Sequence, residues 1–189
     1  MPQFDGIISL LDSRSFGSIW FWLVLIGMWS AAGRTVLGVP SEVLTHARRD
    51  HDLHPEGPGV ITLLDWLSLS LARWHLSQTE GAAFLAASSF ALTSLAVLGF
   101  GYGLEMAQAL VLLLTPFWLL FWMRVRLARH LLPLLQAGQV GERPVAEVAD
   151  EAIRRMLTHR RLVTALSIVS VAVTALWGTF WALTHPYGF

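Results

Sequence analysis

Residues 106–123 have the sequence MAQALVLLLTPFWLLFWM and contain no charged side chain. A helix on the surface of a soluble protein shows a polar face along its length, whereas a helix that crosses a bilayer needs about 20 predominantly apolar residues. This stretch is therefore typical of a membrane-spanning helix.

Three other uncharged stretches flank it on both sides along the chain. The four predicted spans cover about residues 16–33, 82–100, 106–123 and 162–184. Two long charged connections, 34–81 and 124–161, join the first span to the second and the third to the fourth. We therefore expect an all-α integral membrane protein, a four-transmembrane-helix bundle with amphipathic cytoplasmic helices, in which residues 1–189 form a single membrane domain.

The composition supports this class and excludes several others. Of the 189 residues, 54% are hydrophobic and 14% are charged, against about 25% charged in an average soluble domain. Thirteen basic residues balance thirteen acidic ones, so the chain lacks the net basic charge of a nucleic-acid-binding protein. Cysteine is absent and every basic residue is arginine, which excludes thiol nucleophiles, cysteine-bound metals and a catalytic lysine.

The arginines predict the orientation. Twelve of the thirteen lie in the two long connections, and only Arg14 lies outside them. By the positive-inside rule, both connections are cytoplasmic and both termini are periplasmic in a bacterial inner membrane. Asp5 and Asp12 make the N-terminal region acidic, unlike the basic start of a cleaved signal peptide, so we expect the first span to be retained.

The two connections contain different patterns. Residues 39–59 are polar and include three prolines, which favours a solvated loop. Residues 60–78 repeat apolar side chains every three or four positions, which predicts a helix that either lies in the membrane interface or extends the second span. Pro144 is suited to a first helical turn and predicts a helix that runs from there into the fourth span.

Arginines before the fourth span form one candidate contact surface, for anionic lipid headgroups or for an acidic protein. They are Arg154, Arg155, Arg160 and Arg161. Alternatively, these residues only fix the topology. Asp150 precedes Arg154 by four positions, as Glu151 precedes Arg155, and opposite charges at this spacing pair on a helix.

Small residues form stripes at three- and four-residue spacing on two spans, which allows helices to approach closely. The stripe on the second span is Ala82, Ala86, Ser89, Thr93 and Ala96, and the stripe on the fourth is Thr164, Ser167, Ser170, Thr174 and Gly178. Either stripe packs inside the bundle or contacts a partner subunit. We take Ser167, Ser170, Thr174 and Gly178 as the candidate partner contacts.

Candidate chemistry is sparse. All seven histidines lie outside the predicted spans, which argues against haem held inside the bundle. His46, His51 and His54, with two aspartates between them, are weak metal candidates because their spacing matches no closed four-ligand pattern. No nucleophile with a base and an orienting group is visible. We therefore expect no catalytic residues, no cofactor and no enzymatic activity.

A glycine-rich turn, residues 99–103, joins the second and third spans. Without a preceding strand it predicts a simple turn rather than a nucleotide loop. Glu105 follows it with no evident partner, and its carboxylate suits the N-terminal end of the third helix. The alternative for Glu105 is an ion or proton site on the periplasmic side.

Several motifs together resemble a small alphaproteobacterial inner-membrane family. They are DSRSF at 12–16, WFW at 20–22, VLGVP at 36–40, LGF at 98–100, YG at 102–103, AQA at 107–109, LTHR at 157–160 and TALWG at 174–178. Members are often labelled components of the SufBCD complex of iron–sulfur assembly. The resemblance implies a membrane anchor or accessory for that machinery.

We therefore expect a non-catalytic accessory, anchor or scaffold subunit that contacts the lipid bilayer and a protein partner, in the membrane or at its cytoplasmic face. One alternative is a stable subunit of a respiratory or photosynthetic complex. Another is a membrane enzyme or metal sensor that uses the segment from His46 to His54.

Overall fold

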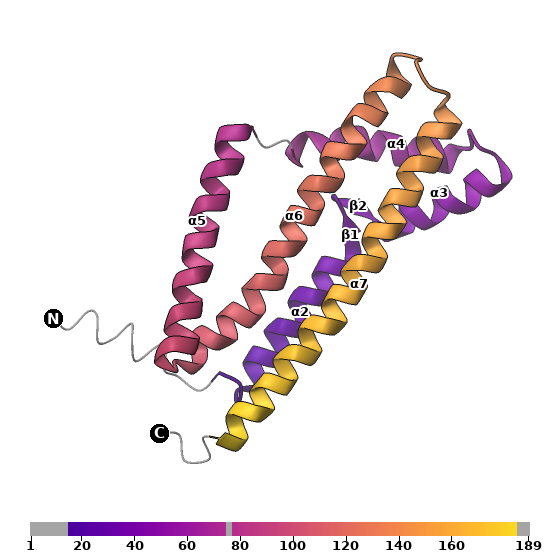
Figure 1. Ribbon diagram of the computed structural model, residues 1–189. Helices are drawn as coiled ribbons and strands as arrows, with labels where there is room; N and C mark the ends of the chain where they lie inside the picture. The colour runs from indigo at the N-terminus through magenta and orange to yellow at the C-terminus, as the bar shows by residue number, and fades with distance from the viewer. Residues whose placement is uncertain (1–14, 75–76, 185–189) are drawn as a thin grey trace. The chain divides into compact units, whose positions relative to one another are not determined.

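The computed structural model describes residues 15–74 and 77–184 and is all-α apart from one short hairpin. The helices are α2 (Ile19–Arg34), α3 (Ser41–Leu53), α4 (Pro58–Leu71), the 3₁₀ turn η1 (Ala72–Trp74), α5 (Gln78–Ala96), the π-helical turn η2 (Val97–Gly101), α6 (Glu105–Gln139) and α7 (Val145–Thr184) (Figure 1). Strands β1 (Thr35–Val36) and β2 (Val39–Pro40) pair antiparallel. The all-α class is confirmed, and the hairpin was not predicted.

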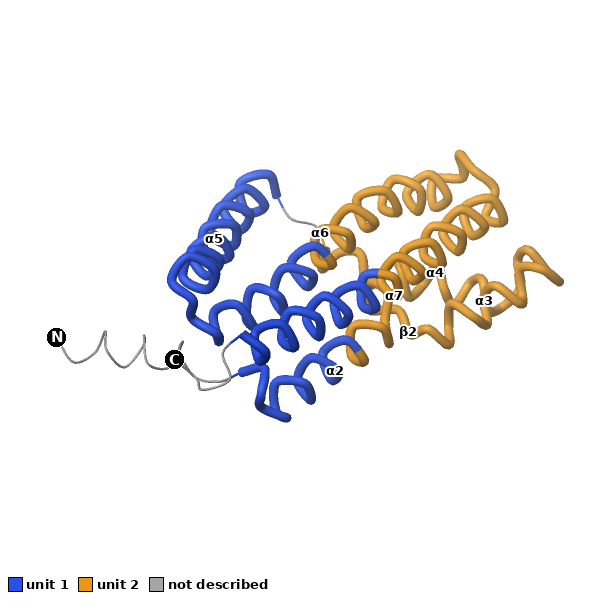
Figure 2. Tube along the Cα trace, turned by 60° about the horizontal axis from the view of Figure 1, so that its bottom comes forward, with its two compact units in different colours: residues 1–29, 77–119, 166–189 blue, residues 30–76, 120–165 orange. Residues whose placement is uncertain are grey.

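The chain divides into two compact units, coloured separately in Figure 2. Unit 1 comprises residues 1–29, 77–119 and 166–189, and unit 2 comprises residues 30–76 and 120–165. Helices α2, α6 and α7 each contribute residues to both. The sequence predicted a single membrane domain and did not predict this division into two units.

Three helices are long and apolar enough to cross a membrane: α5 with η2, α6 and α7. They contain the predicted second, third and fourth spans. α2 is apolar but has only 16 residues, about 24 Å at 1.5 Å per residue against a hydrocarbon core of about 30 Å. It begins at Ile19 rather than at residue 16 because Ser15 starts a turn, in which its carbonyl accepts from the N–H of Ser18 at 3.1 Å.

α6 and α7 continue well past the predicted spans. The end of α6 is a glycine cap: Gly141 has φ of +78°, a conformation that glycine adopts readily, and the N–H of Glu142 turns back to the carbonyl of Ala137 at 2.9 Å. α7 begins directly after Pro144 and runs for 40 residues. The prediction of an unbroken helix from Pro144 into the fourth span is confirmed.

The predicted solvated loop at residues 39–59 is wrong, because most of it forms α3. Leu44 and Ala47 are buried on one face of this helix, and Val43 packs beside them. Three apolar residues within five positions are enough to hold one face against a core, while the charged residues stay on the other face.

α4 confirms the predicted helix within residues 60–78, although residues 75–76 lie outside the described part. Leu63, Leu67 and Leu71 are buried, and Asp65 is exposed. α5 begins with its own capping box, in which Ser77 and Glu80 each accept from the other's backbone N–H. A helix that starts with its own cap does not continue the preceding one, so α4 is not an extension of the second span.

Unit 2 has its own hydrophobic core, in which α3 and α4 pack with the last turns of α6 and the first turns of α7. Its largest fully buried side chains include Leu44, Leu63, Leu67, Leu131 and Met156. The β1–β2 hairpin adds Val36, Leu37 and Val39 to the same cluster. Both predicted connections therefore form one folded unit with a shared core.

Candidate functional site

Charge is divided unequally between the two units. Every arginine among the described residues lies in unit 2. The described residues of unit 1 carry only two charged side chains, Glu80 and Glu105. Unit 1 instead exposes large apolar side chains such as Ile19, Phe90 and Leu176. Exposed apolar surface on this scale marks a membrane-facing or protein-facing surface.

Glu151 holds two of the four candidate arginines. The Nε of Arg155 donates to Oε1 of Glu151 at 2.7 Å, and Arg154 pairs with the other carboxylate oxygen. The hydrogen bond from Arg155, with the charges of both arginines, lowers the pKa of the Glu151 carboxyl. The Glu151–Arg155 pair is confirmed, whereas Arg154 pairs with Glu151 instead of Asp150.

The other two candidates, Arg160 and Arg161, are exposed and form no ion pair among the described residues. Arg161 also lines a cavity of about 270 Å³ with Arg48 and His51 of α3. Asp52 and Asp150 line the same cavity, so its charge is mixed. Arg160 and Arg161 are the candidate arginines most available to an external anion.

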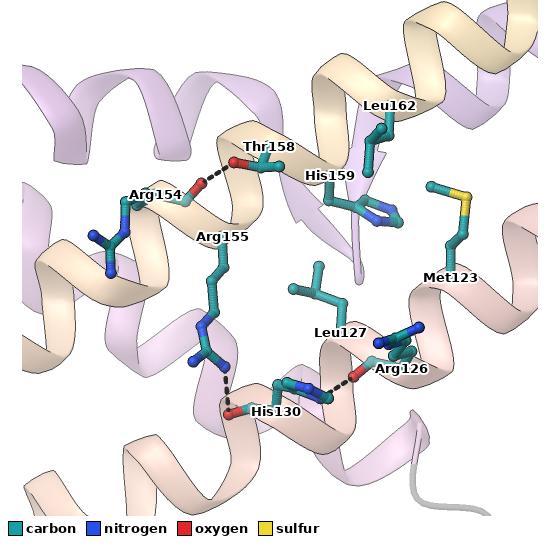
Figure 3. Close-up of a pocket in the computed structure, with 9 residues that line it drawn as sticks. All are labelled: Met123, Arg126, Leu127, His130, Arg154, Arg155, Thr158, His159 and Leu162. Atoms are coloured by element: carbon teal, nitrogen blue, oxygen red, sulfur yellow. Dashed lines mark hydrogen bonds between the residues drawn. The ribbon is translucent and has the colours of Figure 1, made fainter.

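A groove of about 480 Å³ runs between α6 and α7 within unit 2 (Figure 3). Met123, Leu127 and Leu162 give it an apolar side, and Arg126 and Arg155 give it positive charge. The Nη1 of Arg155 donates to the carbonyl of His130 at 3.3 Å, which ties α7 to α6 at one end. The groove thus combines cationic and apolar walls.

His159 lines the same groove and is only 5% exposed. Its Nε2 has no hydrogen-bond partner among the described residues. Burying a polar atom without a partner costs free energy, so such an atom indicates a missing ligand or a site of strain. No sequence signal marks this environment, because His159 lies at the boundary before the predicted fourth span and its neighbours across the groove come from a distant segment, α6.

Arg124 has a structural role in unit 2. Its Nη2 donates to the carbonyl of Ala32 at 2.9 Å, and its guanidinium lies 5.9 Å from the ring centroid of Trp74. Ala32 is in the last turn of α2, where carbonyls have no partner within the helix. Arg124 therefore caps α2 through one of its guanidinium donors.

The three candidate metal-ligating histidines do not converge. His46 is exposed and its Nδ1 lies 3.9 Å from Oδ2 of Asp50, while Nε2 of His51 lies 3.3 Å from the carbonyl of Ala146. His54 is exposed after the end of α3. No group of three or more potential metal ligands occurs in the described part of the chain. The arrangement gives no support to a metal site here.

Asp50 instead joins α3 to α4. Its Oδ2 accepts from the N–H of Gly59 at 2.7 Å, in the first turn of α4. A Cβ on Gly59 would lie 2.6 Å from Nδ1 of His46 and 2.8 Å from the same Asp50 oxygen. Asp50 and His46 therefore lie where α3 contacts the start of α4.

Glu105 is buried and has three hydrogen-bond donors around it. Its Oε1 accepts from the backbone N–H groups of Ser15 and Phe16 at 2.6 and 2.7 Å. Its Oε2 accepts from Nε1 of Trp181 at 3.2 Å. The expectation that Glu105 lacks a partner is wrong, and its position as the first residue of α6 agrees with the predicted helix-end role.

Gln108, one turn later, extends this polar cluster. Its Nε2 donates to the carbonyl of Gly99 at 2.8 Å, and its Oε1 accepts from Nε1 of Trp177 at 2.9 Å. Gly99 lies so close to α6 that a Cβ there would be 2.7 Å from the N of Gln108. Residues 99–101 belong to the π-helical turn η2, so the predicted simple turn at residues 99–103 is confirmed only for its last part, before α6 begins at Glu105.

The two small-residue stripes differ in exposure. Ser170, Thr174 and Gly178 are buried within unit 1, with a Cβ on Gly178 placed 3.1 Å from the ring of Phe16. This burial favours internal packing for these three residues, whereas Ser167 is half-buried and Thr164 is exposed. On α5, whose residues are all described, only Gly81 is buried. The stripe on α5 is therefore the more accessible of the two.

Comparisons with protein-family models, with curated proteins and with solved structures find no match to this chain.

Proposed function

We propose that this chain is a multi-pass protein of the bacterial inner membrane and serves as a non-catalytic anchor or accessory subunit. In this proposal α2, α5, α6 and α7 provide four membrane segments, both termini are periplasmic, and unit 2 is the cytoplasmic part that binds a protein partner. The observation that supports it is the separation of charge, with all described arginines in unit 2.

Two physical arguments support this assignment. Apolar side chains that are exposed in unit 1 need a nonaqueous surrounding, and a bilayer supplies one. Arginines collect on the cytoplasmic side of membrane proteins. Unit 2 also has its own core, so it can present a fixed surface, including Arg160 and Arg161, to a soluble partner.

The topology is tested with single cysteines, because the chain has none of its own. Tyr102→Cys and Glu142→Cys place thiols at two exposed turns. A membrane-impermeant maleimide is expected to label Tyr102→Cys in intact spheroplasts and Glu142→Cys only after permeabilisation. The reverse pattern, or labelling of both in intact cells, contradicts the proposed topology.

The accessory role is tested by purifying the tagged full-length chain from native membranes in a mild detergent. We expect a co-purifying protein at constant stoichiometry that is lost in the double variant Arg160→Gln/Arg161→Gln and kept in the control Arg143→Gln. The resemblance noted above makes soluble iron–sulfur assembly proteins the first partners to look for. A chain that purifies alone, or a partner unaffected by the double variant, contradicts this surface.

A second candidate function, a stable subunit of a larger membrane complex, is favoured by the exposure of α5. Lipid-facing positions suit large apolar residues, whereas exposed small residues suit contact with another helix. Ala86 and Ala91 are both exposed and lie on different sides of α5, with Ala86 in the small-residue stripe. Ala86→Leu is expected to release the chain from such a complex and Ala91→Leu to retain it; equal retention argues against this interface.

A further inference from the structure

We propose that the groove between α6 and α7 in unit 2 binds one phospholipid with an anionic headgroup from the cytoplasmic leaflet. This inference rests on the proposed membrane topology and adds a specific ligand to it. The site is formed by Arg126 and Arg155, which supply positive charge along the groove for the headgroup, by His159 for a hydrogen bond, and by Met123 and Leu162 for the start of an acyl chain.

The walls of the groove change from apolar to cationic in the direction that a lipid requires. Met123 and Leu162 are the residues at which the predicted third span ends and the fourth begins. His130 on α6 and Arg155 on α7 lie seven residues further toward the cytoplasm, about 10 Å along a helix. Figure 3 shows Met123, His159 and Leu162 together at one end, with Arg155 and His130 toward the other. A phospholipid at this level places its chains beside Met123 and Leu162, its glycerol oxygens beside His159 and its headgroup toward Arg155.

Charge complementarity selects an anionic headgroup. Arg126 is exposed, and its side chain forms no hydrogen bond or ion pair with the described residues. Arg155 uses two donors, one to Glu151 and one to the carbonyl of His130, out of the five that a guanidinium carries. Free guanidinium donors pair with phosphate oxygens in a geometry that matches their fork.

His159 supplies an independent indication that something occupies the groove. The side chain is 5% exposed and its Nε2 lacks a partner among the described residues. A headgroup or glycerol oxygen in the groove provides that partner, and removes the cost of a buried polar atom left unpaired. The groove's volume of about 480 Å³ lies within the ~300–1,000 Å³ of ordinary ligand pockets.

The test uses the full-length chain in a mild neutral detergent, titrated with phosphatidylglycerol or with phosphatidylcholine of the same acyl chains. Bound lipid is counted by native mass spectrometry. We expect one phosphatidylglycerol to bind at least fivefold more tightly than phosphatidylcholine. Equal binding of the two lipids overturns the proposal.

Matched variants distinguish lipid binding in the groove from attraction of lipid by general surface charge. Arg126→Gln is expected to weaken phosphatidylglycerol binding about fivefold, whereas Arg129→Gln, an exposed position on the same helix that does not line the groove, leaves it unchanged. Equal losses of phosphatidylglycerol binding in the two variants show that the lipid is attracted only by diffuse surface charge. That result overturns the proposed site. His159→Phe keeps a ring but removes the nitrogens, and is expected to weaken binding several-fold with an unchanged melting temperature; full binding in that variant also overturns the site.

Two further controls identify the source of the phosphate and keep this inference separate from the proposed function. Glycerol 3-phosphate, which lacks acyl chains, is expected not to displace the lipid, and efficient displacement overturns the choice of a lipid. Arg126→Gln is expected to retain the protein partner that depends on Arg160 and Arg161. A chain that purifies without a partner but binds phosphatidylglycerol selectively shows that only the proposed accessory role fails. A chain that keeps its partner but binds the two lipids equally shows that only the lipid site fails.

Discussion

The carboxylate of Glu105 accepts a hydrogen bond from the backbone N–H of Phe16, 89 positions earlier in the chain, at 2.7 Å. Together with Ser15 and Trp181, this contact joins the segment before α2, the start of α6 and the end of α7 within unit 1. A single acidic side chain therefore fixes three chain segments at one end of the predicted bundle.

Glu105→Ala is expected to lower the free energy of unfolding by about 3 kcal/mol, because it leaves two buried backbone N–H groups and an indole N–H without an acceptor. Glu105→Gln keeps an acceptor oxygen and is expected to cost about half as much. Thermal unfolding in a mild detergent measures both. Glu80→Gln, at an exposed helix cap in the same unit, is the control, and a loss as large as that of Glu105→Ala contradicts the prediction.

Gly99→Ala is expected to destabilise the chain by about 1–3 kcal/mol, the usual cost of forcing atoms into a packed site. The new Cβ meets backbone atoms of α6, which cannot move aside as a flexible side chain does. Gly101→Ala is the matched control, since the nearest atom to its Cβ is 3.8 Å away on Val97. Comparable melting temperatures for the two variants are incompatible with the close approach.

Thr174→Val addresses the buried stripe on α7. Thr174 is fully buried, and its hydroxyl has no hydrogen-bond partner among the described residues. Removing an unpaired buried hydroxyl is expected to leave stability unchanged or to raise it by about 1 kcal/mol. Thr179→Val removes a hydroxyl that donates to the carbonyl of Ala175 at 2.8 Å and serves for comparison. A clear loss of stability in Thr174→Val but not in Thr179→Val contradicts the prediction, because it indicates that the Thr174 hydroxyl does form a hydrogen bond.

Asp50→Ala is expected to lower stability by about 1 kcal/mol, as loss of a helix-end acceptor does, because the N–H of Gly59 loses its partner.

Replacing His46, His51 and His54 together by alanine is expected to leave the zinc and nickel content of the purified protein unchanged. Elemental analysis of the unsubstituted protein and of the triple variant measures the zinc and nickel content of each. Stoichiometric metal that disappears in the triple variant restores the metal-site alternative.

Glu151→Gln is expected to increase binding of anionic lipid to the full-length chain in a mild neutral detergent. The neutral amide no longer balances Arg154 and Arg155, and each arginine near an anionic surface contributes about 1 kcal/mol, so the affinity rises about fivefold or more. Titration with phosphatidylglycerol, against phosphatidylcholine, with bound lipid counted by native mass spectrometry, measures the change. Asp65→Gln, which removes an exposed charge without an ion pair among the described residues, is expected to have less effect.

The sequence predicts the long apolar helices well because each is a continuous uncharged run, which needs no knowledge of distant contacts. Residues 41–53 illustrate where this approach fails. Their charged residues outnumber the few apolar ones, and the helix forms because Leu44 and Ala47 meet a core supplied by other segments. Tertiary packing, not local preference, determines that element.

The partners of Glu105 and the groove at His159 could not be predicted for a related reason. Ser15, Phe16 and Trp181 lie between 76 and 90 positions from Glu105, and no spacing rule connects residues so far apart. Arg126 and Arg155 likewise face one groove only because α6 and α7 pack together in unit 2. The sequence did indicate the chemical types, an acidic residue at a helix start and arginines beside the fourth span.

The hydrogen-bond partners of Glu105 are translated at different times, which sets the order in which this cluster forms. The ribosome makes Ser15 and Phe16 first, so two of its donors exist before Glu105 itself. Trp181 follows 76 positions later, roughly 4–15 s at ~5–20 residues per second. During that interval α5, which carries its own cap at Ser77, can already be helical. The Glu105 carboxylate gains its last donor, the indole N–H of Trp181, only after that residue is translated. A nascent chain thus completes this end of the bundle only when its final helix has been translated.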